Sequence, residues 1–190
     1  MTYNEFRDKY KGKYIDVDNQ YGAQCWDLAQ RYFTECLKLP ASVLGGCGLV
    51  SNMLYPPKRN ELDKYFDEVP TTAMYGGDVV IWEYGHIAIF DHWDGKKNWY
   101  FSQNPNPCNV ITINRYGVHA FRLKGEKPTT IYKTVSNCYW LNLRTSPSYG
   151  NNIYTSIKVG TKLEYLGEES GWAKVKYDNK TLYCGKNYLK

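Results

Sequence analysis

A short polar segment, GEKPTT at residues 125–130, divides the chain into two parts with different residue patterns. Before it, apolar residues first recur at the spacing of a helix, in residues 25–38, and then alternate as in β-strands after Gly76-Gly77. After it, the chain consists of short strand-like runs and turns. This order predicts an α+β unit followed by a small all-β barrel. The expected regions are a first domain at residues 1–125, a linker at residues 126–130 and a second domain at residues 131–190.

The individual elements follow from the same patterns. In the first part we expect helices at residues 25–38 and 60–67, strands at residues 79–84, 86–93, 98–103 and 109–115, and a further strand around His119. In the second part the expected strands lie within residues 134–144, 153–158, 161–169, 172–178 and 181–185.

The composition is that of a folded globular protein. Hydrophobic residues make up 43% of the chain and charged residues 23%, which excludes a disordered chain. No run approaches the roughly 20 apolar residues of a membrane span. The first residues, MTYNEFRDKYKGKY, are polar and lack the apolar centre of a secretory signal. We therefore expect neither a signal peptide nor insertion into a membrane.

The cysteines do not follow a known framework. There are six of them, without a CxxC pair or a regular spacing, so neither a zinc site nor a set of disulfides is indicated. We expect free thiols, as in a protein made in a reducing cytosol.

The charge is distributed unevenly along the chain. Residues 1–128 hold 15 basic and 15 acidic side chains, whereas residues 129–190 hold 9 basic and 4 acidic ones, so the net charge of +5 lies in the second part. This asymmetry favours an anionic partner, although a modest excess also serves solubility alone. Aromatic residues reach 16%, a fraction suited to sugar or polymer recognition but also to the core of a β-sheet.

Cys25 is the candidate nucleophile. It stands directly before the apolar-periodic run, so its sulfur is expected at a helix N-terminus, where the helix dipole and free N–H groups favour the thiolate. Of the three histidines, His86 opens an apolar strand and is the best placed general base, whereas His92 falls near a turn and His119 in a separate strand. The alternative is a buried cysteine with no role beyond packing.

A third polar group should hold the imidazole in the correct tautomer. The next strand runs into Ser102-Gln103-Asn104, which could place such a group beside His86.

The segments AQCWD, GHIAIF and SQN together resemble the CHAP family of cysteine amidohydrolases, which cleave peptidoglycan. The resemblance covers about residues 1–125 and implies a papain-like α+β fold, with Cys25 as nucleophile and His86 as base. Members of the family often carry Glu where this chain has Ser102, and Asn104 is then the expected orienting residue. Gln24 would join the Cys25 backbone N–H as an oxyanion donor.

The second part is similar to bacterial SH3-like cell-wall-binding domains, through LNLRTSP and the run VGTKLEYLGEESGWAKVKYDNKTLYCGKNYL. Cys184 departs from the pattern, which usually has Gly in the closing piece. The resemblance implies binding to the cell wall, and the excess positive charge favours an anionic wall polymer over a domain that merely packs on the enzyme. The aromatic residues expected at the wall are Tyr139, Trp140, Trp172 and Tyr183.

The segment before Cys25 has the ligand spacing of a calcium loop, with positions 1, 3, 5, 7 and 12 occupied. The five candidate ligands are Asp16, Asp18, Gln20, Gly22 and Asp27. Position 6 is Tyr21 rather than Gly, and no convincing helix precedes the loop, so a true EF-hand is not expected. Hard carboxylates favour Ca²⁺, and the segment also resembles the calcium site of some CHAP enzymes. The alternative is a polar turn capped by Asp16 or Asp18.

A catalytic domain followed by a wall-binding domain, without a signal peptide, resembles the arrangement of phage endolysins. The resemblance implies synthesis in the host cytoplasm and access to the wall through holin-made membrane lesions. The sequence leaves open which bond is cut, an N-acetylmuramoyl-L-alanine amide or a stem or cross-bridge peptide bond, because they present similar carbonyls. A host autolysin with the same chemistry and a non-catalytic wall-binding protein are the alternatives, and a general protease is a weaker one. We expect a monomer that binds no nucleic acid.

Overall fold

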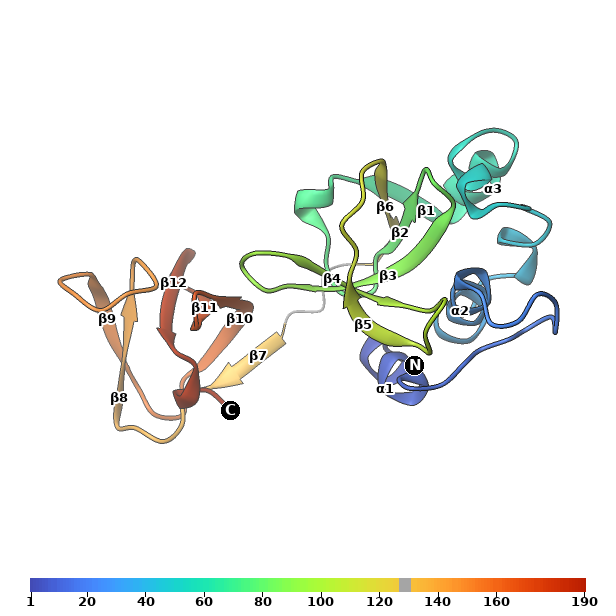
Figure 1. The fold of residues 1–190 in the computed structure, drawn as a ribbon. Helices are drawn as coiled ribbons and strands as arrows, with labels where there is room; N and C mark the ends of the chain where they lie inside the picture. Colours follow the sequence, from blue (N-terminus) through green and yellow to red (C-terminus); the bar gives the residue numbers. More distant parts are fainter. Residues whose placement is uncertain (127–130) are drawn as a thin grey trace. The chain divides into compact units, whose positions relative to one another are not determined.

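The computed structural model describes residues 1–126 and 131–190, which form two compact units (Figure 1). The first unit is made mainly of residues up to 126 and the second mainly of residues from 131 onward. Most of the predicted linker, residues 127–130, lies outside the described residues. Each unit has a hydrophobic core of its own, so each can be understood from its own sequence.

The helices of the first unit come mostly before its sheet. The α-helices are α1 (Tyr3–Tyr10), α2 (Cys25–Arg31) and α3 (Lys58–Tyr65), with a π-helical turn η1 (Tyr32–Cys36) and 3₁₀ turns η2 (Ala41–Val43), η3 (Val50–Leu54) and η4 (Thr71–Ala73). The helix predicted at residues 25–38 is found as α2 with η1, and the helix predicted at residues 60–67 as α3. Helix α3 ends at Tyr65, because Phe66 and Asp67 already belong to a strand that the sequence analysis did not predict. Among the described residues, no helix has the length and apolar character needed to cross a membrane.

Helix α1 was not expected from the sequence. Thr2 caps its first turn by accepting a hydrogen bond from the Glu5 backbone N–H, and the Glu5 carboxylate accepts one from the Thr2 N–H. Phe6 is the one buried side chain of this helix. The helix is thus stabilised by its cap and by an aromatic stripe in which Tyr3 and Tyr10 pack on the core beside Phe6. The sequence analysis did not use this i, i+3, i+7 spacing.

The sheet of the first unit has six strands in the order β1-β6-β2-β3-β4-β5. Their bounds are β1 (Phe66–Val69), β2 (Val79–Trp82), β3 (His86–Trp93), β4 (Asn98–Ser102), β5 (Asn109–Thr112) and β6 (Val118–Leu123). The central pair is an antiparallel hairpin in which Trp82 faces His86 and Val79 faces Ile89. The expected helix-then-sheet order is confirmed, and the expected strands are found where the alternation placed them.

The two faces of the sheet bury different residues. Residues such as Ile81 and Ile87 pack with the helices in the main core, whereas Trp82, Ala88 and Tyr100 form a second cluster on the other face. Both faces of β2 are therefore buried, and all four of its residues are inaccessible to solvent. This explains why the sequence shows a continuous apolar run there.

The second unit is a single six-stranded sheet, in the order β7-β10-β11-β12-β8-β9, around one apolar core. Its elements are β7 (Ile131–Thr134), β8 (Trp140–Arg144), β9 (Ile153–Lys158), β10 (Lys162–Glu169), β11 (Trp172–Tyr177), β12 (Lys180–Gly185) and the 3₁₀ turn η5 (Lys186–Tyr188). The expected strand at residues 134–144 is interrupted, because Asn137 adopts a φ of 59° and the regular strand resumes at Trp140.

All six cysteines of the chain lie in the described residues and are free thiols, as expected.

Candidate functional site

Cys25 lies at the start of α2, as the sequence predicts, and is 8% exposed. Burial raises the pKa of its thiol, and hydrogen bonds from the backbone of Ile87, Trp26 and Cys25 itself lower it without offsetting the burial. The N–H groups at the start of the helix do favour the thiolate, as the sequence predicts, but desolvation has the larger effect on the pKa of this thiol. The contact with Ile87 brings the sulfur to the residue that follows His86.

His86 is the first residue of β3 and follows a turn that requires glycine, since Gly85 has a φ of 95°. Its Nε2 atom lies 2.8 Å from the Ser102 hydroxyl on the neighbouring strand. Burial lowers the pKa of His86 to about 4, so the ring is neutral at neutral pH. Trp82 lies beside the ring, with centroids 5.6 Å apart, and Tyr84 stacks on it at 6.1 Å with an interplanar angle of 2°.

Ser102, and not Asn104, is the residue that contacts His86. Strand β4 ends at Ser102, and the chain then turns away, with Asn104 exposed at a φ of 78°. The expected role of Asn104 is therefore corrected: a residue beyond the strand end does not share the direction of its side chains. The serine found at the usual Glu position supplies the hydrogen bond instead.

Gln103 has a structural position that the sequence analysis did not assign. Its side chain is buried and accepts a hydrogen bond from the Ile15 N–H at 2.7 Å, while its Nε2 donates to the carbonyls of Ile15 and Gln24 at 2.8 and 2.7 Å. The Cys108 thiol donates to the same Oε1 atom. Gln103 thus joins the end of β4 to the segment that leads into Cys25.

Gln24 lies at the N-cap of α2 with its backbone held at both ends. Its N–H donates to Asp27 at 2.8 Å, and its carbonyl accepts from Gln103. Its side chain is half-buried next to Cys25. This position suits an oxyanion donor, which stays a prediction.

The other two histidines have carboxylate partners away from Cys25. His92 Nδ1 lies 2.6 Å from Asp91, and His119 Nδ1 lies 2.9 Å from Glu68. These contacts leave His86 as the candidate base.

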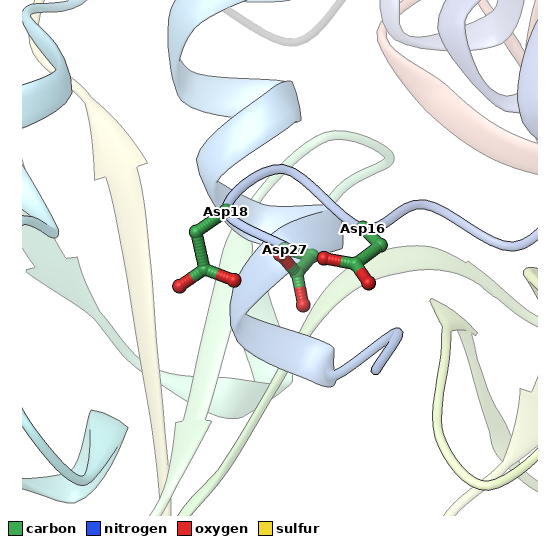
Figure 2. A group of neighbouring side chains, drawn as sticks. All are labelled: Asp16, Asp18 and Asp27. Carbon is green, nitrogen blue, oxygen red and sulfur yellow. The ribbon is translucent and has the colours of Figure 1, made fainter. Parts of the chain in front are cut away.

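Three carboxylates gather before α2. Oxygen atoms of Asp16, Asp18 and Asp27 lie within 4.8 Å of one another (Figure 2). Asp27 is buried and accepts hydrogen bonds from the N–H groups of Val17 and Gln24, whereas the other two are exposed. Contrary to the sequence analysis, a helix does precede this loop, but α1 ends at Tyr10 and residues 11–24 contain no helix, so it does not lead directly into the loop as in an EF-hand.

The remaining two candidate ligands lie on the same loop. Gln20 and Gly22 are both exposed, and their part in a cation site stays a prediction. The polar-turn alternative also has support, because Asp16 accepts the Asn19 N–H and Asp18 accepts the Gln20 N–H.

The aromatic residues proposed for wall contact differ in exposure. Tyr139 and Trp140 are 88% and 58% exposed, and Lys158 lies over the Trp140 ring. Trp172 is partly buried against Tyr149, and Tyr183 donates a hydrogen bond to Glu169.

The sequence analysis did not single out Tyr149 or Tyr154. Tyr149 is 85% exposed, with Arg144 over its ring. Tyr154 donates to Asp178 and lines a shallow hollow with Thr155, Tyr177 and Asp178. The sequence signal that could have identified Tyr149 is its place in the polar loop SPSYGNN. For Tyr154 the only signal is its position in the alternating pattern of β9.

The comparisons with known proteins bear on both units. Residues 141–190 match the family described as bacterial SH3 domain. The chain is 34% identical over 116 residues to a D-alanyl-L-alanine endopeptidase of Streptococcus phage B30, a match that covers 57% of this chain and 26% of that protein. It is 44% identical over 52 residues to a probable endopeptidase p60 of Listeria welshimeri, covering 26% of this chain and 10% of that protein.

The chain resembles a phage endolysin-like peptidoglycan hydrolase. The SH3 match and the endopeptidase relatives confirm the expected resemblance to a peptidoglycan hydrolase with a bacterial SH3 domain. The chain spans about a quarter of the phage relative and a tenth of the Listeria one. A solved structure described as Ly7917 with the hydrolyzing product of MDP covers all of this chain and 98% of its own at 18% identity, with a TM-score of 0.46, too low to establish a common arrangement.

The low pKa of His86 predicts a pH-dependent stability. Between its ordinary value of 6.5 and about 4, the unfolded chain binds a proton that the folded chain does not, so stability falls as the pH falls through this window. The free energy of unfolding, measured by urea denaturation, should decrease between pH 6.5 and pH 4 by about 3 kcal/mol less in His86→Gln than in the wild type. His92→Gln should show the same pH-dependent loss of stability as the wild type. An equal loss in His86→Gln would contradict the argument that burial lowers the pKa of His86.

Ser102→Ala should reduce amide cleavage far more than Asn104→Ala. Loss of the Ser102 hydroxyl frees the imidazole to rotate, and a misplacement of about 1 Å can cost ~100-fold in rate. We expect kcat/KM to fall about 10- to 100-fold in Ser102→Ala and to stay within about twofold in Asn104→Ala. The reverse order would restore Asn104 as the orienting residue.

Proposed function

We propose that this chain is an endolysin-type cysteine hydrolase that cleaves a peptide bond of bacterial peptidoglycan. The observation that carries the proposal is the arrangement of Cys25 against the backbone of Ile87, directly after His86, whose ring bonds to Ser102. A nucleophile beside a general base, which is itself held by an orienting group, is an arrangement that catalyses acyl transfer. The papain-like CHAP fold expected from the motifs belongs to the same proposal.

The state of His86 determines how the reaction begins. When Nε2 carries the ring proton and donates a hydrogen bond to the Ser102 oxygen, Nδ1 is free to accept the proton of the Cys25 thiol. The thiolate then attacks the substrate carbonyl, and the Cys25 N–H and the Gln24 side chain stabilise the oxyanion. His86 returns its proton to the leaving amine, and water releases the acyl-enzyme.

An endopeptidase is favoured over an N-acetylmuramoyl-L-alanine amidase. The phage relative is described as a D-alanyl-L-alanine endopeptidase and the Listeria relative as a probable endopeptidase. Mass spectrometry of digested wall fragments distinguishes the two bonds. In the proposed setting the enzyme is made in the host cytoplasm and reaches the wall through holin-made lesions, and it acts as a monomer.

The second unit is proposed to hold the enzyme on the wall. Its match to the bacterial SH3 domain and the endopeptidase relatives support binding to peptidoglycan. Exposed aromatic rings with cations over them, such as Trp140 with Lys158 and Tyr154 with Lys180, offer stacking together with positive charge. That combination also suits an anionic wall polymer.

Cys25→Ala tests the catalytic proposal against a non-catalytic wall-binding protein. Incubated with purified Gram-positive cell walls, the variant should release new amine termini at least about 1,000-fold more slowly than the wild type. It should still sediment with the walls, because binding is assigned to the other unit. Cys36→Ala, which removes a half-buried thiol elsewhere in the first unit, should retain the activity. Undiminished release by Cys25→Ala would exclude Cys25 as nucleophile.

Calcium is proposed to bind at Asp16, Asp18 and Asp27, with Gln20 and Gly22 as further ligands. Carboxylate oxygens within 4.8 Å of one another fit a cation with oxygen ligands at about 2.3–2.6 Å, and hard oxygen donors favour Ca²⁺ over Zn²⁺. A bound cation would offset the repulsion of three negative charges. Asp27 would link it to α2, because its carboxylate also holds the N–H groups before Cys25.

Calcium should raise the melting temperature of the wild type but not that of Asp16→Asn/Asp18→Asn. A ligand that binds only the folded state stabilises it by about 2.7 kcal/mol at 100 times its Kd. The measurement is a thermal melt after EDTA treatment, with Ca²⁺ or Zn²⁺ added back. Asp8→Asn, which removes an exposed carboxylate outside the loop, should respond like the wild type. If calcium raised the melting temperature of Asp16→Asn/Asp18→Asn as much as that of the wild type, the three carboxylates would form only a polar turn.

A further inference from the structure

Arg115 is an exposed cation close to the candidate active site. It lies between β5 and β6, and its guanidinium carbon is 5.7 Å from the centre of the Tyr84 ring. In the same unit, Arg7, Arg59 and Arg122 each pair with at least one carboxylate. Within residues 1–126 and 131–190, Arg115 forms no such ion pair, so its charge is available to a ligand.

Tyr84 connects Arg115 to the site. The Tyr84 ring is 55% exposed and stacks on the His86 imidazole at 6.1 Å with an interplanar angle of 2°. Burial raises the pKa of the Tyr84 hydroxyl, Arg115 lowers it, and Cys25 raises it further. The ring therefore lies within electrostatic reach of both the cation and the nucleophile.

The acidic residue beside Tyr84 does not take up the charge of Arg115. The Glu83 carboxylate lies 3.5 Å from His119 Nε2 and against Gly117. Glu83 therefore contacts His119 rather than Arg115, and the other ring nitrogen of His119, Nδ1, contacts the Glu68 carboxylate. A carboxylate from outside the protein would thus complete the partners of Arg115.

We infer that Arg115, held on the Tyr84 ring, binds a carboxylate on the leaving-amine part of the peptide substrate. The inference rests on the proposed function, in which His86 gives its proton to the leaving amine; the ring stacked on His86 then borders that part of the substrate. Arginine is suited to this task, since its planar guanidinium forms paired hydrogen bonds with a carboxylate and also stacks on aromatic faces. The substrate class is a wall peptide whose leaving fragment carries a free carboxylate.

The test compares two synthetic peptides that span the bond identified in the wall digest. They differ only at the end of the leaving fragment, which is a carboxylate in one and a carboxamide in the other. For Arg115→Gln, kcat/KM on the carboxylate peptide should fall about 10- to 100-fold, chiefly through KM, and on the carboxamide peptide stay within about twofold. Arg115→Lys should restore part of the preference, because it keeps the charge.

Lys38→Gln is the matched control, since it removes one exposed positive charge elsewhere in the same unit. It should leave both peptides unaffected, and thermal melts should show that all variants are folded. Equal losses on the two peptides in Arg115→Gln, or no preference in the wild type, would overturn the inference while leaving the proposed function intact. A wild type that releases no amine termini from cell walls would overturn the proposed function itself.

Discussion

The buried amide of Gln103 is the contact on which the candidate site depends. Its oxygen and nitrogen are both hydrogen-bonded, to the two backbone groups of Ile15, the carbonyl of Gln24 and the thiol of Cys108. It therefore joins the end of β4 to both ends of the acidic loop, from Ile15 to Gln24 at the start of α2, which are 79 or more positions away in sequence. Because an unsatisfied buried amide is costly, this set of bonds fixes the loop and the strand end in one arrangement. Cys25 and Ser102 each adjoin a residue of that set.

Burial then determines the charge state of the pair. The same packing that positions Cys25 and His86 raises the pKa of the thiol and lowers that of the imidazole. Burial thus disfavours the charged form of each group, whereas a thiolate–imidazolium pair needs both charged. The N–H groups around the sulfur favour the thiolate, but in the closed site they do not outweigh desolvation.

Local pattern was sufficient for the elements but not for the contacts between them. The period of residues 25–38 predicted α2, because a helix buried on one face leaves a regular trace. The apolar runs from residue 79 onward predicted β2 and β3, because strands buried on both faces read as continuous apolar segments. Helix α1 was missed although Tyr3, Phe6 and Tyr10 stand at helical spacing and pack on the core, because three aromatic residues in a polar stretch are a weak signal. Asn104 was chosen by motif, and the choice failed because the strand ends before it. The contact of Arg115 with Tyr84 joins two turns 31 positions apart in sequence, which no local period reveals.

The serine beside His86 has a chemical consequence for the proposed mechanism. A hydroxyl can fix which ring nitrogen carries the proton, but it adds no negative charge to stabilise the imidazolium. Burial therefore acts on His86 without opposition, and its pKa falls to about 4. A proton moves from Cys25 to such a ring only if other groups stabilise the charges that form. In the proposed mechanism those groups are the N–H donors at the start of α2 and the substrate itself, so charge separation would be coupled to the arrival of the carbonyl.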